Sequence, residues 1–119
     1  MALVANDTNQ RDFVIHIGAP KPIMVQFAVD GVLQAFPSTV RFRCNTRGTL
    51  ISKTVGSGIT LSEEEGVDDA TLSVQLTVAE SRTIPVGRVT AYEITDGAAA
   101  EQPIFMGYLI GKGGNNSDV

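Results

Sequence analysis

Five carboxylate side chains within seven consecutive residues are the most prominent candidates for chemistry in this chain. They are Glu63, Glu64, Glu65, Asp68 and Asp69. Clustered carboxylates are ligands that Ca²⁺ prefers, but this run lacks the staggered Asp-x-Asp-x-Asp-Gly spacing of an EF-hand. Like charges this close repel one another and belong in water. The run therefore predicts an acidic loop over residues 62–69 that is either simply solvated or contacts a basic partner, with calcium binding as the less favoured alternative.

The only histidine and the only cysteine both stand in strand-like sequence. His16 follows Val14 and Ile15 with no partner motif, which predicts a partly exposed strand histidine. Cys44 alternates with Phe42, which is typical of a buried small hydrophobic residue. A single cysteine excludes an intrachain disulfide and a cysteine-based metal site.

Two serines, Ser57 and Ser81, are candidate nucleophiles by residue type alone. Neither lies in a Gly-x-Ser-x-Gly elbow, and one histidine in the chain leaves little to activate a hydroxyl. We therefore expect a protein that is not an enzyme, with no catalytic residue, no metal and no cofactor.

Composition limits the partners that the chain can have. Its 119 residues suffice for one domain, and 43% of them are hydrophobic. The net charge is −4, and the nine Lys and Arg residues are scattered, which argues against nucleic-acid binding. No apolar stretch approaches the ~20 residues of a membrane span, so we expect no membrane partner.

Alternating apolar residues predict an all-β fold, an antiparallel sandwich of about seven to eight short strands. Nine stretches are strand-like, and two of them, 32–34 and 59–61, are only three residues long; the others are 12–17, 23–29, 39–45, 50–55, 71–76, 89–94 and 102–110. Asp30-Gly31 predicts a tight hairpin turn. A flexible arm is expected over residues 1–11 and a flexible tail over residues 112–119, on either side of a domain at 12–111.

The stretch Thr71–Gly87 predicts a crossing between the two layers of the sandwich. It opens as a strand with Leu72, Val74 and Leu76 on one face. Thr77 followed three residues later by Glu80 fits a capping box, so a short helical turn is expected near Val78–Arg82. Pro85 and Gly87 then punctuate the return into the next strand.

Two of the predicted strands are apolar on both faces, which indicates contact with another chain. Opposite their expected inward residues stand Met24, Ala28, Phe105 and Leu109. These four predict a protein–protein interface and a homo-oligomer; the alternative is a face covered by the chain's own loops or arms. Tyr92 and Tyr108 are both expected on inward faces, which disfavours a sugar site because sugars stack on exposed aromatic rings.

The chain resembles the small immunoglobulin-like domains of tailed-phage structural proteins, including the N-terminal domain of phage baseplate upper proteins. The resemblance covers residues 12–111 and rests on Asp12–Ile15, Lys21–Ile23, Asp30-Gly31, Val40–Arg43, Gly58–Leu61, Leu72–Thr77, Ala79–Ser81, Pro85–Gly87, Tyr92–Ile94 and Met106–Ile110. The family usually has Thr where Ser81 stands and a polar residue or Gly where Ala19 stands. The acidic run at 63–69 is unusual for the family.

The resemblance implies an immunoglobulin-like sandwich and a structural role. On this interpretation the protein belongs to a virion assembled in the cytoplasm of a bacterial host, as a capsid decoration or accessory protein or as a tail or baseplate subunit. Its partners would be other virion structural proteins and further copies of itself. The alternative is a receptor- or carbohydrate-binding module, assisted by calcium through the acidic run.

Overall fold

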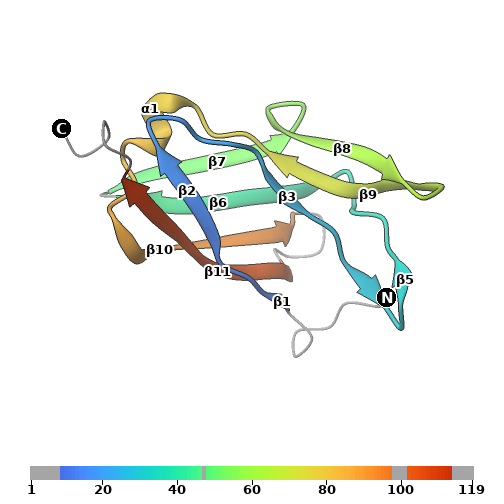
Figure 1. Cartoon of the computed structure of the whole chain (residues 1–119). Helices are drawn as coiled ribbons and strands as arrows, with labels where there is room; N and C mark the ends of the chain where they lie inside the picture. The colour runs from blue at the N-terminus through green and yellow to red at the C-terminus, as the bar shows by residue number, and fades with distance from the viewer. Residues whose placement is uncertain (1–8, 47, 98–101, 114–119) are drawn as a thin grey trace.

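The chain folds mainly into β-strands and has one short helix (Figure 1). The computed structural model describes residues 9–46, 48–97 and 102–113. In them the elements are β1 (Asn9–Gln10), β2 (Phe13–Ile17), β3 (Ile23–Val25), β4 (Ala28–Val29), β5 (Val32–Leu33), β6 (Val40–Thr46), β7 (Thr49–Val55), β8 (Gly58–Glu64), β9 (Val67–Val74), α1 (Val78–Ser81), β10 (Gly87–Asp96) and β11 (Gln102–Gly113). The all-β expectation is confirmed, and so is the helical turn, with Arg82 as its C-cap.

Nine of the described strands form one sheet in the order β1-β11-β10-β6-β7-β8-β9-β3, with β2 also beside β11. The remaining two, β4 and β5, form a separate hairpin. Residues 18–22 lead from β2 at one end of this order into β3 at the other end. The sheet therefore curls around its own interior (Figure 1).

The sequence predicted antiparallel pairing throughout, but some of the strand pairs are parallel. β1 and β2 run parallel to β11, and β7 runs parallel to β8 over two residue pairs. Alternation of apolar residues reports which face of a strand is buried, and that pattern is the same for either pairing direction. The pairing direction of β1 and β2 follows from their tertiary placement beside β11.

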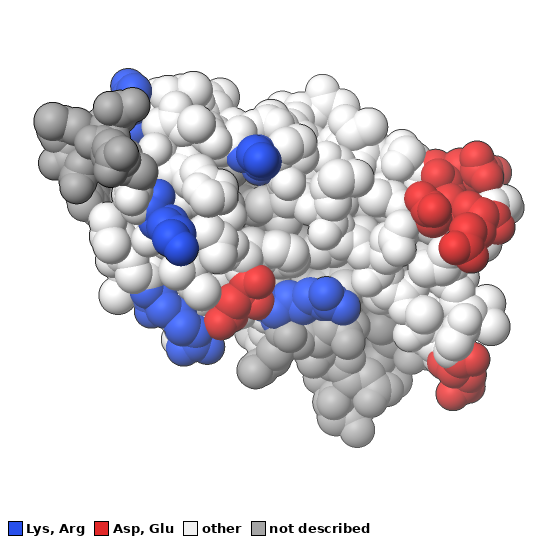
Figure 2. Space-filling model, viewed as in Figure 1, with Lys and Arg blue, Asp and Glu red and all other residues white. Residues whose placement is uncertain are grey.

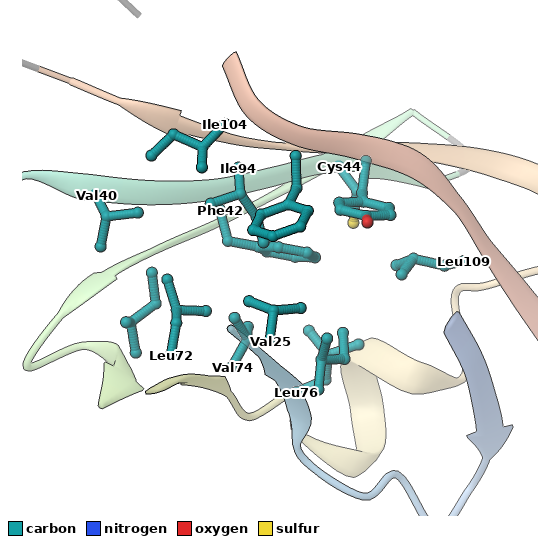
Figure 3. Packing of buried hydrophobic residues seen from close by; sticks show 14 of the residues in the cluster. Val25, Val40, Phe42, Cys44, Leu72, Val74, Leu76, Ile94, Ile104 and Leu109 are labelled. Carbon is teal, nitrogen blue, oxygen red and sulfur yellow. The ribbon is translucent and has the colours of Figure 1, made fainter. Parts of the chain in front are cut away.

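The curled sheet encloses one hydrophobic core. Figure 3 shows Phe42 and Ile94, from β6 and β10, facing Leu72 and Val74 of β9. All four of these side chains are fully buried. The rings of Phe27, Phe36 and Phe105 pack together at one side of the core, with centroids 5.0 to 6.3 Å apart. Such packing is favourable beyond the burial of area alone.

The stretch from Thr71 to Gly87 leads from β9 through α1 into β10, and α1 begins with the predicted capping box, which is complete. The Thr77 hydroxyl accepts a hydrogen bond from the Glu80 amide at 3.0 Å, and a Glu80 carboxylate oxygen accepts one from the Thr77 amide at 2.8 Å. Two helical N–H groups that would lack partners are thereby satisfied. Lys53 of β7 pairs with the same carboxylate at 2.8 Å, so the cap also ties α1 to the sheet.

The predicted strand over residues 23–29 is interrupted. β3 ends at Val25 and β4 begins at Ala28. Between them the buried Phe27 packs on Phe36, and its carbonyl accepts a hydrogen bond from the Gln34 amide. The expected tight turn is present, because Asp30-Gly31 links β4 to β5 with positive φ at both residues.

The outer boundaries also differ from those predicted. β1 occupies residues 9–10 of the expected N-terminal arm, and β11 extends through residues 112–113 of the expected C-terminal tail. The rest of both predicted segments, residues 1–8 and 114–119, lies outside the described residues.

Candidate functional site

The acidic residues lie on a β-hairpin rather than in a loop. β8 runs to Glu64 and β9 begins at Val67, so Glu65-Gly66 alone make the turn, with φ of 53° and 82°. A Glu63 carboxylate oxygen accepts a hydrogen bond from the Gly66 amide at 2.7 Å. The predicted loop over residues 62–69 was wrong because a two-residue turn with positive φ suffices to reverse antiparallel strands.

These carboxylates gather at one end of the molecule, where Figure 2 shows them as a red cluster. Glu63, Glu65, Asp68 and Asp69 are exposed, and Glu64 is half-buried. Asp69 has a positive φ of 58°, and its carbonyl accepts a hydrogen bond from the Phe36 amide. Among the described residues, no group of three or more His, Cys, Asp or Glu side chains is placed to hold a metal ion.

Among the candidate catalytic groups, the Ser81 hydroxyl and the Cys44 thiol are both buried. The buried Ser81 hydroxyl donates to the Val78 carbonyl at 2.7 Å and accepts from the Gly18 amide at 3.0 Å, so it joins α1 to the turn after β2. Burial raises the pKa of the Cys44 thiol to about 12, which keeps it protonated and unreactive. His16 is exposed on β2, opposite Lys112 in the strand register.

The predicted four-residue interface does not exist as one surface. Met24 and Ala28 are exposed as expected, but the Phe105 and Leu109 side chains are buried, with exposed fractions of 1% and 0%. Both belong to the hydrophobic core. They are not available to another chain.

A β-bulge in β11 explains this error. Ile94 and Thr95 are consecutive on β10, but they pair with Phe105 and Pro103, so Ile104 is an extra residue on β11. An extra residue reverses the alternation that follows it. Ile104 and Phe105 are both buried as a result, and every later residue of β11 points to the face opposite from the one predicted.

The same reversal turns Tyr108 outward. Its ring lies under the Arg88 guanidinium, 4.2 Å from the ring centroid. Arg88 also pairs with Asp12 at 2.7 Å, and the other Asp12 carboxylate oxygen accepts a hydrogen bond from the Tyr108 amide at 3.0 Å. The hydrogen bond from Arg88 lowers the pKa of the Asp12 carboxyl below its ordinary value. Tyr92, by contrast, faces inward as predicted.

One outward-facing surface of the sheet combines apolar and charged side chains. It lies across β7, β6, β10 and β11, and we call it the Leu50–Met106 face. Its residues are Leu50, Asn45, Arg43, Ala91, Glu93 and Met106, which line a shallow depression of about 370 Å³. The Leu50 side chain is 61% exposed and that of Met106 is 39% exposed. Leu50 and Met106 lie on the two outer strands of this face, with β6 and β10 between them. A sheet face that exposes large apolar side chains is a candidate contact surface.

The strand register places the charges of this face side by side. Glu93 of β10 lies directly opposite Arg43 of β6 and, on its other side, opposite Met106 of β11. Arg43 in turn lies opposite Ser52 of β7. Oppositely charged side chains in directly opposed positions attract one another. The face is therefore balanced in charge at its centre.

None of these residues was singled out from the sequence, although the alternation contained the signal. Ile51 faces the core, so Leu50 must face outward; Tyr92 faces the core, so Ala91 and Glu93 must face outward. The sequence does not reveal the strand order. No short segment indicates that β7 and β11 lie on either side of β6 and β10. Met106 could be placed outward only once the bulge was known.

Comparison with family models, with curated proteins and with solved structures gave no match to this chain. Among the described residues no helix is long and apolar enough to cross a membrane.

Proposed function

We propose that this protein is a non-enzymatic structural subunit that acts through protein–protein contacts, in the virion of a tailed phage. The Leu50–Met106 face carries the proposal. Across four neighbouring strands of the sheet it presents exposed apolar side chains, together with a pair of opposite charges. A sheet face that combines apolar and charged side chains can bind another folded subunit.

The strand arrangement supports an immunoglobulin-like sandwich, as the sequence resemblance implies. β11, β10, β6 and β7 would form one layer, with β2 at its edge, and β8, β9 and β3 would form the other. β7 and β8 pair over only two residue pairs, and this short pairing supports a passage between layers at that point. Two sheets packed over alternating inward side chains are typical of immunoglobulin-type domains.

Within the virion, a capsid decoration or accessory protein and a tail or baseplate subunit are the two locations proposed. Both require contacts with other virion structural proteins. The exposed acidic hairpin at residues 63–69 offers a second surface for such contacts, suited to a basic partner because five carboxylates gather there.

Mass spectrometry of purified phage particles from the source of this chain tests the proposal. We expect the protein at a fixed copy number per particle. Leu50→Asp should reduce its incorporation strongly, whereas Val86→Asp, a matched change at an exposed residue of the segment before β10, should not. Detection in infected-cell extract but never in particles would overturn the proposal.

A carbohydrate- or receptor-binding module is a second candidate, and one observation favours it. Tyr108 points outward, where a sugar could stack on its ring, although Arg88 already covers one side of that ring. A glycan array would report binding that Tyr108→Ala abolishes. A rise in melting temperature on adding calcium would support the calcium-assisted form of this candidate.

A further inference from the structure

We propose that the Leu50–Met106 face binds the same face of a second copy of this chain, around a two-fold axis that runs between β6 and β10. This inference rests on the proposed function, because it names the partner of the same surface. It makes the functional unit a symmetric homodimer, the commonest form of closed assembly.

The charge arrangement is the first reason to expect a second copy. Arg43 and Glu93 occupy the same row of the sheet on neighbouring strands. A two-fold axis between those strands places Arg43 of one subunit over Glu93 of the partner subunit, and the reverse contact forms at the same time. Two oppositely charged contacts thus arise from one pair, which is the self-complementarity that a two-fold interface requires.

The apolar residues follow the same symmetry. In the next row of the sheet, Leu50 lies opposite Asn45 on β7 and β6, and Ala91 lies opposite Tyr108 on β10 and β11. The two-fold operation brings β7 of one subunit over β11 of the other, so the exposed Leu50 meets the Ala91–Tyr108 side of the partner. The contact would bury apolar surface on both sides of the central charge pairs, and that burial would favour association.

The outer surface of the other layer does not offer an equivalent patch. In the part of this surface that the structure describes, the exposed large apolar side chain is that of Met24 on β3. Met24 lies opposite Ser73 of β9, and Ser73 lies opposite Thr60 of β8. Hydroxyl-bearing neighbours make this row polar, and it carries no pair of opposite charges. The observations therefore favour the Leu50–Met106 face.

The test uses two charge-reversal variants of the full chain, Glu93→Arg and Arg43→Glu. Sedimentation velocity and native mass spectrometry over a range of concentrations should show a dimer for the wild-type protein. Each variant alone places like charges across the axis, so its dimer dissociation constant should rise at least ~10-fold, which corresponds to about 1.4 kcal/mol. An equimolar mixture of the two variants should recover a heterodimer, because every contact across the axis is again between opposite charges.

Recovery on mixing separates a lost interface from a damaged fold, since neither variant could rescue the other if it were unfolded. As further controls, Leu50→Asp should weaken the dimer, whereas Met24→Asp and Val86→Asp should not. The proposal is overturned if the wild-type protein is a monomer at all concentrations, if both charge variants dimerise like the wild type, if mixing restores nothing, or if Met24→Asp alone disrupts the dimer.

The two proposals fail in different ways. A monomer that is nevertheless present in purified particles removes the homodimer and leaves the structural role in place. A dimer that never appears in particles removes the virion role and leaves the interface.

Discussion

The Tyr92 hydroxyl donates a hydrogen bond to the Arg11 carbonyl oxygen, with 2.7 Å between the two oxygens. This contact joins β10 to the segment between β1 and β2, 81 residues earlier in the chain. The Tyr92 ring meanwhile packs on Phe42 and Phe13. Burial, with a smaller effect of the Asp12 charge, raises the pKa of Tyr92, so the hydroxyl remains a donor throughout the physiological range. One side chain thus connects the core to the first strands.

Tyr92→Phe should remove this hydrogen bond and keep the ring contacts. The free energy of unfolding should fall by about 1 kcal/mol, measured by urea denaturation. Amide hydrogen exchange should accelerate locally at Arg11, whose N–H is bonded to the Met106 carbonyl. Tyr108→Phe, which changes an outward-facing hydroxyl, is the matched control and should leave that exchange rate unchanged.

Gly107→Ala should displace the segment around Arg11 by steric overlap, not by loss of a hydrogen bond. A Cβ on Gly107 would overlap the Arg11 carbonyl group, so the backbone of one strand must move. We expect a loss of about 1–3 kcal/mol and faster exchange of the Arg11 amide. Gly48→Ala is the control: it adds strain at a positive φ, but its Cβ meets nothing within 4 Å, so Arg11 should stay protected. Equal exchange at Arg11 in both variants would contradict this explanation.

Phe105 and Leu109 should behave as core residues. Phe105→Ala should cost about 3–5 kcal/mol and Leu109→Ala about 2–5 kcal/mol in unfolding free energy, because each leaves a cavity. Met24→Ala, at a side chain that is 60% exposed, should stay within about 0.5 kcal/mol of the wild type. Chemical denaturation of the three variants measures the difference. If Phe105→Ala and Leu109→Ala left the unfolding free energy nearly unchanged, the burial of these two side chains would be contradicted.

Acid should weaken the helix cap at Glu80. Partial burial raises the pKa of this carboxyl, but hydrogen bonds from Lys53 and from the Thr77 amide outweigh burial and hold the pKa below its ordinary value. A group whose pKa is lower in the folded state contributes stability above its unfolded-state pKa. That contribution is lost as the pH falls through the folded-state pKa.

The unfolding free energy of the wild-type protein should therefore decrease more steeply below about pH 4.5 than that of Glu80→Gln, which has no charge to lose. Lys53→Gln should also flatten the acid slope, since it removes the hydrogen bond and positive charge that favour the ionised carboxyl. Denaturation series from pH 7 to pH 3 give the slopes. Identical acid slopes in all three proteins would assign the pH dependence to other carboxyls.

Local signals in the sequence were sufficient wherever one short segment decides its own structure. The capping box at Thr77 and Glu80, the Asp30-Gly31 turn and the inward faces of β6 and β9 depend on residues close together in the chain, and each was predicted correctly. The acidic run is evident in the sequence, but the loop predicted over residues 62–69 is longer than the two-residue turn at Glu65-Gly66. β8 and β9 remain paired up to Glu64 and Val67, so only two residues are left for the turn. The run of like charges suggested instead that the strands separate earlier.

Relationships between distant segments were decided only by the tertiary structure. The parallel placement of β2 on β11, the bulge at Ile104 that buries Phe105, and the alignment of Arg43 with Glu93 all depend on register between strands far apart in sequence. One extra residue exchanges the two faces of a strand, and an alternating pattern carries no mark of where that residue lies. The sequence by itself therefore determined an all-β fold and its capped helical turn, whereas the tertiary packing decided which side chains of each strand are exposed.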